Sequence, residues 1–180
     1  LSVCNLKDGD ARATYKNVKY DLRQYKRLRM FTHAEAAGIQ SELKDNDVSV
    51  FIRLGSDFDQ NYYEYEVPMS VTPWYTNNDD EIWPEENNFD IKLSDLQNLK
   101  INRSSTTSVL SVVDTILDNN VHISVKGNPK LANVTTIMIG VRNPDKDTNP
   151  FGTSDDGRAK CATIWVNELR LSEFDEKSGS

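Results

Sequence analysis

Apolar and polar residues alternate along several short stretches of this chain, with a period close to two. The clearest stretch covers residues 162–171 and is followed at once by Ser-Glu-Phe-Asp-Glu at 172–176. Its apolar side carries Ile164, Val166, Leu169 and Leu171. Trp165 lies on the opposite side. This alternation predicts a half-buried β-strand. Because a strand near the end of a domain must be paired to stay ordered, we expect it inside a sheet, hydrogen-bonded on both sides.

Further strand patterns recur along the chain and are separated by residues that favour turns. They occupy residues 28–34, 48–54, 62–68, 121–125 and 136–141. Glycine, asparagine and aspartate lie between several of them, as hairpin turns require. Many short strands with little helix predict an all-β sandwich with one or two short helices.

Helical patterns are few. Residues 94–100 predict one or two helical turns capped by Ser94, with Leu96 and Leu99 facing inward. Residues 104–118 fit a helix of period 3.6; a strand also fits their middle, and we favour the helix. Residues 143–160 are polar and predict a loop of unusual length, and such loops are more often functional or disordered than not.

Length and charge limit the class of protein. A chain of 180 residues suits one domain, and we expect a single β-sandwich domain over residues 1–180, excised from a larger protein, with its core at about 12–176. No apolar run approaches the roughly 20 residues of a membrane-spanning helix. The formal net charge of −7 argues against a nucleic-acid surface. A basic stretch with interleaved tyrosines at 12–29 could bind RNA or anionic glycan, but the solvent face of an edge strand is the favoured interpretation.

The chain has two cysteines, Cys4 and Cys161, which lie near its opposite ends. With no CxxC motif and two histidines, a zinc site is not expected. In an oxidising compartment a disulfide could join the N-terminal segment to the last strand. The sequence leaves open whether the two cysteines are adjacent.

No catalytic motif is recognisable, so we do not expect an enzyme. His33 is expected to be packed or half-exposed, and His122 to be solvated. Glu64 and Glu66 lie two positions apart on one face of a predicted strand, an arrangement that glycoside hydrolysis could use. Carboxylates on the surface of a sandwich are usually solvated, and we expect these two to be so.

Four phrases in the chain resemble a carbohydrate-binding-module-type jelly roll, the galactose-binding-like β-sandwich. They are Asp-Leu-Arg-Gln-Tyr-Lys-Arg-Leu-Arg-Met-Phe at 21–31, Tyr-Tyr-Glu-Tyr-Glu-Val-Pro at 62–68, Trp83 with 91–96, and the strand 164–171. Each phrase is weak alone, but their order over about 150 residues is moderately specific. This resemblance implies a jelly-roll fold.

A narrower resemblance covers most of residues 12–176. The segments at 15–35, 51–57, 62–66, 82–88 and 165–171 are together similar to part of the SprA/Sov proteins. These are very large outer-membrane β-barrel translocons of the type IX secretion system in Bacteroidetes, linked to gliding motility. The resemblance implies a soluble β-domain inserted into a barrel protein and exposed outside the hydrocarbon layer.

The resemblance to carbohydrate modules suggests an aromatic binding site, because such modules stack sugars on exposed rings. Trp74, Tyr75 and Trp83 flank an acidic loop and are the candidates. A structural role is favoured instead, with Trp83 packed under the loop and Trp74 closing one end of the sandwich.

Jelly rolls of this type also often hold a structural Ca²⁺ between an N-terminal loop and an acidic residue of the last strand. Here Asp8 and Asp10 could supply the loop, and Glu168 the strand. Otherwise Glu168 would pair with a basic side chain. No other cofactor is expected.

The expected function is that of a non-catalytic accessory domain of a type IX translocon, acting in scaffolding or partner contact during protein export and gliding. Its partners would be other parts of the translocon, secretion-system proteins or cargo. Its location would be the outer membrane, on the cell surface or the periplasmic side, and its contact regions the loops 73–90 and 143–160. An autonomous carbohydrate-binding module is the alternative, and a glycan-degrading enzyme that uses Glu64 or Glu66 is a third, weaker one.

Overall fold

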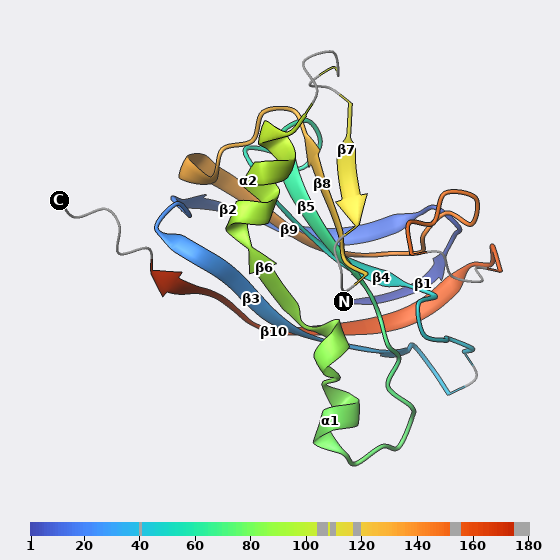
Figure 1. The fold of residues 1–180 in the computed structure, drawn as a ribbon. Helices are drawn as coiled ribbons and strands as arrows, with labels where there is room; N and C mark the ends of the chain where they lie inside the picture. The colour runs from blue at the N-terminus through green and yellow to red at the C-terminus, as the bar shows by residue number, and fades with distance from the viewer. Residues whose placement is uncertain (40, 104–107, 109–110, 117–119, 152–155, 175–180) are drawn as a thin grey trace.

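The computed structural model describes residues 1–39, 41–103, 108, 111–116, 120–151 and 156–174. They form two antiparallel sheets that face each other across a common core (Figure 1). The four-stranded sheet has the order β1 (Ser2–Leu6), β10 (Lys160–Phe174), β3 (Tyr25–Ala36), β6 (Phe89–Lys92). The six-stranded sheet has the order β2 (Ala11–Tyr20), β9 (Val134–Arg142), β4 (Ser49–Gly55), β5 (Tyr62–Pro68), β8 (His122–Lys126), β7 (Val113–Ile116). The prediction of an all-β sandwich is confirmed.

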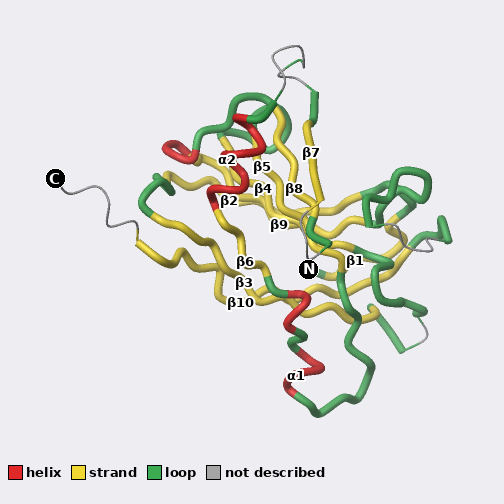
Figure 2. Tube along the Cα trace, viewed as in Figure 1, coloured by secondary structure: helices red, strands yellow, loops and turns green. Residues whose placement is uncertain are grey.

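Helical structure is short, as predicted, and lies outside the sheets (Figure 2). The α-helices are α1 (Asp79–Ile82) and α2 (Leu93–Ile101), and single 3₁₀ turns cover Glu85–Asn87 and Leu131–Asn133. Helix α2 buries Leu96 as expected, but it begins at Leu93, so Ser94 lies in its first turn and does not cap it. None of the helices in the described ranges combines the length and the apolar character needed to cross a membrane.

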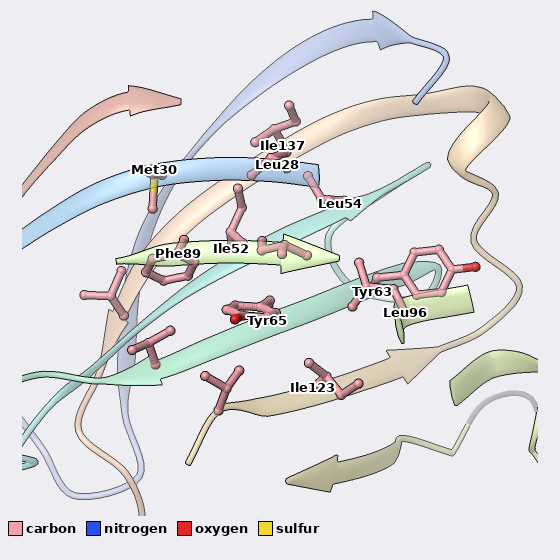
Figure 3. Close-up of a cluster of buried hydrophobic side chains, with 14 of the residues drawn as sticks. Leu28, Met30, Ile52, Leu54, Tyr63, Tyr65, Phe89, Leu96, Ile123 and Ile137 are labelled. Carbon is pink, nitrogen blue, oxygen red and sulfur yellow. The ribbon is translucent and has the colours of Figure 1, made fainter. Parts of the chain in front are cut away.

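The core lies between the two sheets because each strand sends alternate side chains inward. Leu28 and Met30 on β3 meet Ile52 and Leu54 on β4, and all four are fully buried (Figure 3). Burying one such side chain stabilises the fold by about 1.5–3 kcal/mol. Strand β1, which precedes the range expected to form the core, also contributes Leu6.

The segment 104–118 differs from its predicted helix wherever the structure describes it. Val113–Ile116 forms strand β7, which pairs antiparallel with β8. Strand β8 offers an unpaired edge there, and β-branched residues such as Val113 and Thr115 suit a strand, so pairing overrides the helical pattern. The remainder of that predicted helix lies largely outside the described residues. The long loop predicted at 143–160 is present as the connection between β9 and β10, with 152–155 outside the described residues.

The last strand, β10, departs from the prediction in its second half. It pairs with β3 from Ala162 to Phe174, but its pairing with β1 reaches only Thr163, with Leu1 bonded to Ile164. In the described part of the chain β10 is therefore hydrogen-bonded on both sides before Trp165 and on one side after it. A bulge interrupts the β3 ladder between Asn167 and Arg170. A disulfide between Cys4 and Cys161 holds β1 against the first half of β10.

Candidate functional site: a buried charge network

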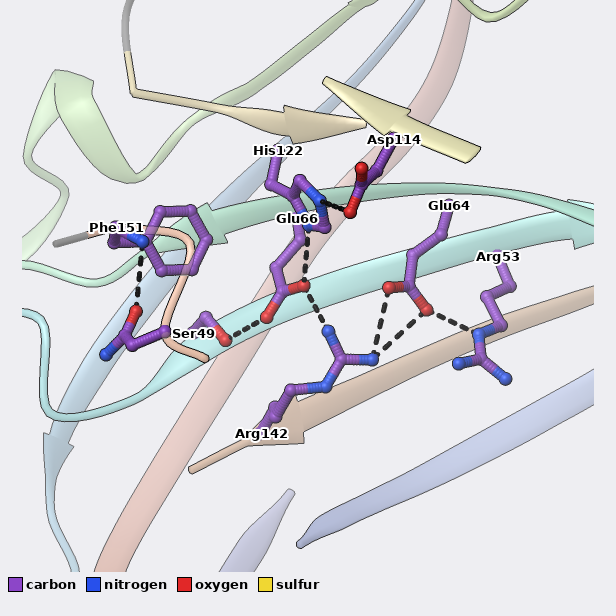
Figure 4. A network of polar contacts seen from close by, with 9 residues as sticks. Ser49, Arg53, Glu64, Glu66, Asp114, His122, Arg142 and Phe151 are labelled. Carbon is purple, nitrogen blue, oxygen red and sulfur yellow. Dashed lines mark hydrogen bonds and ion pairs between the residues drawn. The ribbon is translucent and has the colours of Figure 1, made fainter. Parts of the chain in front are cut away.

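The outer face of the six-stranded sheet carries a line of ionisable side chains that crosses five strands. The register of the strands creates this line. Arg53 on β4 lies opposite Glu64 on β5, and Glu66 on β5 lies opposite His122 on β8. Arg142 at the end of β9 and Asp114 on β7 extend the line at its two ends (Figure 4).

Glu66 is the most buried ionisable group of the network, with 1% of its surface exposed. Arg142 donates to its Oε2, and the Ser49 hydroxyl donates to its Oε1. The Nδ1 atom of His122 lies 3.5 Å from Oε2. Burial alone would raise the pKa of Glu66, but the contacts with His122, Arg142 and Ser49 outweigh it and lower the pKa. Glu66 is therefore held in its ionised form.

Glu64 shares the same arginine. The Nη2 atom of Arg142 lies 3.1 Å and 3.2 Å from the two carboxylate oxygens of Glu64, and Arg53 donates to it from the other side. The Arg142 guanidinium also lies 4.7 Å from the Phe51 ring centroid, and that of Arg53 lies 4.1 Å from the Tyr62 ring. Such cation–π contacts add about 0.5–2 kcal/mol each. The network thus combines two carboxylates, two guanidinium groups and two rings, and each carboxylate has a cationic partner.

His122 connects this unit to the solvent. Its Nε2 lies 3.1 Å from the exposed carboxylate of Asp114, while its Nδ1 faces Glu66. Burial lowers the pKa of His122, but the hydrogen bonds and charges of Glu66 and Asp114 outweigh it and raise the pKa. Both ring nitrogens donate to carboxylates in the protonated form, so the network favours a charged imidazole.

The loop that follows β9 covers part of this network. Asn143 is fully buried, and its amide donates to the carbonyl oxygens of Leu6 and Arg158, which fixes the two ends of the loop. Phe151 places its ring edge-on to His122 at 6.3 Å. A cleft of about 200 Å³ remains between the loop and the sheet. Its lining includes Glu66, Asp114, His122, Arg142, Pro144, Asp145, Thr148 and Pro150.

In this arrangement the positive and negative side chains neutralise one another and hold neighbouring strands together. A general acid needs a carboxyl group that stays protonated near the working pH, whereas the contacts of Glu66 keep it ionised. Glu64 accepts hydrogen bonds from two arginines. These contacts join β9, β4, β5, β8 and β7 and stiffen the outer face of the sheet.

The expectation that Glu64, Glu66 and His122 are solvated is wrong. Both glutamates are buried and His122 is largely so, because the sheet brings arginines next to them and the loop covers them. A sequence signal did exist, since Arg53 interrupts an otherwise apolar strand and Arg142 ends another. A cation at such a place requires an anionic partner.

The three candidate aromatic residues do not form one surface. Trp83 is partly buried and packs against the buried His33, with ring centroids 5.7 Å apart. Trp74 and Tyr75 lie on the preceding loop with 42% and 79% of their surfaces exposed. The ring of Trp83 is thus engaged in packing, while those of Trp74 and Tyr75 face solvent.

Of the three candidate calcium ligands, Glu168 lies far from Asp8 and Asp10. Asp8 follows β1 and accepts a hydrogen bond from the backbone of Lys146, and Asp10 lies near Arg12. Glu168 pairs with Arg170 at the β10 bulge. Lys160, the residue of β10 opposite Leu6, precedes Glu168 by eight positions, about 26 Å along a strand. Within the described ranges, no three His, Cys, Asp or Glu residues cluster as a metal ion would need.

The family model SprA_N, described as motility related/secretion protein, matches residues 1–180. No curated protein matches the chain. The match extends over the whole sandwich, including the charge network and the long loop beside it. The chain therefore belongs to the SprA_N family of motility-related and secretion proteins.

Proposed function

We propose that this chain is a non-catalytic domain of an outer-membrane translocon of the type IX secretion system, acting through contacts with other parts of the translocon, secretion-system proteins or cargo. The observation that carries the proposal is the match of residues 1–180 to a motility and secretion family. The segments between 12 and 176 that resemble SprA/Sov proteins point the same way.

The charge network supports a non-catalytic role. Arg142 and Arg53 together neutralise Glu64 and Glu66, and the Ser49 hydroxyl donates to Glu66. These contacts leave no poised acid–base pair among these residues. A rigid outer face suits a domain that acts by holding its surfaces in place. Its contacts would be made by the exposed loops and edges of the sandwich.

The experiment is an in-frame deletion of residues 1–180 from the chromosomal gene of a gliding bacterium that carries this chain. We expect gliding to stop and cargo export to fall, while the abundance of the protein in the outer membrane stays unchanged. A matched strain carries Ile101→Ala, an exposed change on α2 that preserves the domain. Normal gliding and export in the deletion strain would overturn the proposal.

A carbohydrate-binding role is a second candidate, favoured by the exposed rings of Trp74 and Tyr75, whose centroids lie 6.3 Å apart. Affinity electrophoresis in gels that contain polysaccharide tests it. Retardation that is lost in Trp74→Ala and kept in Phe174→Ala, a control at an exposed ring on β10, would support this role. Equal mobility with and without polysaccharide would reject it.

A further inference from the structure

Two cations at the C-terminal end of α2 reach across to the connection between β8 and β9. Lys100 lies in the last turn of the helix, and Arg103 directly follows its C-cap. The Lys100 ammonium donates to the carbonyl oxygen of Pro129 at 2.7 Å, and Nη1 of Arg103 donates to that of Gly127 at 2.8 Å. Helix α2 packs against β8, which brings both side chains to this turn (Figure 1).

A third cation, Lys130, follows Pro129 directly in the sequence. Lys130 is exposed, whereas Lys100 and Arg103 are partly buried. Burial lowers the pKa of Lys100, and the positive charges of Arg103 and Lys130 lower it further. Lys100 is therefore close enough to both side chains to be repelled by them. No described carboxylate lies within ion-pair distance of any of the three cations.

Arg103 also has one edge of its guanidinium group unused. Its Nε and Nη2 atoms are buried, and neither has a hydrogen-bond partner in the described part of the chain. The N–H groups along this edge are parallel, which is the arrangement that binds two oxygens of one carboxylate or phosphate group. A charged donor that is buried without an acceptor destabilises the fold. An acceptor from outside the described residues would remove this cost.

The charges and the donors together select the class of ligand. The paired N–H groups of Arg103 require two oxygens at the spacing found in a carboxylate, phosphate or sulfate group. Lys100 and Lys130 supply further donors and positive charge, which suits a group with a third oxygen and more than one negative charge. A water molecule would accept from Arg103 but would leave the repulsion on Lys100 unchanged. A phosphate or sulfate group meets all of these conditions.

We propose that Arg103, Lys100 and Lys130 form a binding site for a phosphate or sulfate group. Nε and Nη2 of Arg103 donate to two oxygens of the group, and the ammonium groups of Lys100 and Lys130 approach the others. Inorganic phosphate and the headgroup of a phospholipid share this chemistry. The bound group links the end of α2 to the turn that follows β8. This binding does not depend on the translocon role proposed above.

An NMR titration with sodium phosphate tests the proposal, with sodium chloride at equal ionic strength as the reference. We expect the Nε–H signal of Arg103 to shift and to saturate with phosphate and with sulfate, because this group donates to the bound anion. Acetate, which has two oxygens and one charge, should bind more weakly. Equal affinity for acetate, or the same response to chloride, would overturn the proposal. In the second case a water molecule is the acceptor.

Variants of the protein sharpen the test. Arg103→Gln should weaken phosphate binding about tenfold or more, because both paired donors are lost. Arg103→Lys should bind nearly as weakly, since lysine lacks the paired geometry. Lys130→Gln changes an exposed residue, so it should keep the fold and weaken binding less. Lys92→Gln removes the same charge at the other end of α2 and should bind like the wild type. Wild-type affinity in Lys130→Gln, or an equal loss in Lys92→Gln, would contradict the proposal.

Vesicles distinguish the free anion from a lipid headgroup. The protein is sedimented with phosphatidylcholine vesicles that contain or lack phosphatidic acid. Co-sedimentation that requires phosphatidic acid and is lost in Lys130→Gln assigns the site to a lipid phosphate. Binding of inorganic phosphate without co-sedimentation assigns it to the free anion. Failure of both overturns the proposal, whereas the proposed export role is tested separately by the deletion strain.

Discussion

The outer face of the six-stranded sheet and the second half of β10, residues 165–174, here called the open side, place side chains in contrasting surroundings. On the face, Glu64 and Glu66 are buried charges, and every one of their oxygens contacts a donor. On the open side, Val166 and Leu169 are apolar residues left half-exposed. A completed buried network needs nothing from outside, whereas an uncovered apolar strip gains free energy when a partner covers it. The first region stabilises the domain through its own contacts, whereas the second leaves apolar side chains in contact with solvent.

The largest effect is expected from breaking the network at its shared arginine. Arg142→Ala leaves Glu64 and Glu66 close together and without their common cation, so the free energy of unfolding should fall by about 3–5 kcal/mol. Urea denaturation at pH 7 measures this. Arg142→Lys keeps the charge and loses the paired geometry, so it should lose less. A loss in Arg142→Ala no larger than that in Arg142→Lys would contradict this role of the arginine.

The disulfide between Cys4 and Cys161 marks the boundary between the covered and the open halves of β10. Cys4→Ser with Cys161→Ser should lower the free energy of unfolding by about 2–4 kcal/mol. It should also increase amide exchange at Ile164, because β1 is then tied to β10 by hydrogen bonds alone. Wild type under reducing conditions should behave like the variant. An unchanged Tm in both cases would contradict this role of the disulfide.

His122 gives the network a dependence on pH. Its pKa is raised above its ordinary value of 6.5, so its protonated form stabilises the fold below pH 6.5, and that contribution is lost as pH rises through the raised pKa. The stability difference between wild type and His122→Gln should be about 1 kcal/mol at pH 6 and smaller at pH 9. Denaturation curves at both values measure it. A difference that grows with pH would contradict the assignment of the charge.

The smallest effect on stability is expected at the open side. Leu169→Ser removes a half-exposed side chain and should change the free energy of unfolding by about 0.5 kcal/mol or less. The contrast with Arg142→Ala sharpens the difference between the two regions. A loss comparable to that of Arg142→Ala would show that Leu169 is an ordinary core residue. The contrast between the two regions would then be wrong.

The sequence predicts where most of the strands lie, but it does not predict which strands pair with one another. Alternation located β3, β4, β5, β8, β9 and β10, because local burial imposes a period of two on each strand by itself. The helix favoured at 104–118 failed at Val113–Ile116, because the unpaired edge of β8 decides the structure there.

Only part of the candidate site can be predicted from the sequence. Glu64, Glu66 and His122 were singled out, but they were expected in solvent, because their partners lie on other strands. Arg142 follows Glu66 by 76 positions, and only the register of β4 with β5 and β9 brings the two together.

Residue-resolved hydrogen exchange of the free chain tests the contrast between the two regions most directly. The account predicts that the amide of Ile52, central in the six-stranded sheet, exchanges slowly, while that of Val166 exchanges as fast as a surface loop. Strong protection of Val166 in the free chain would contradict the account, because the edge of β10 would then already be filled.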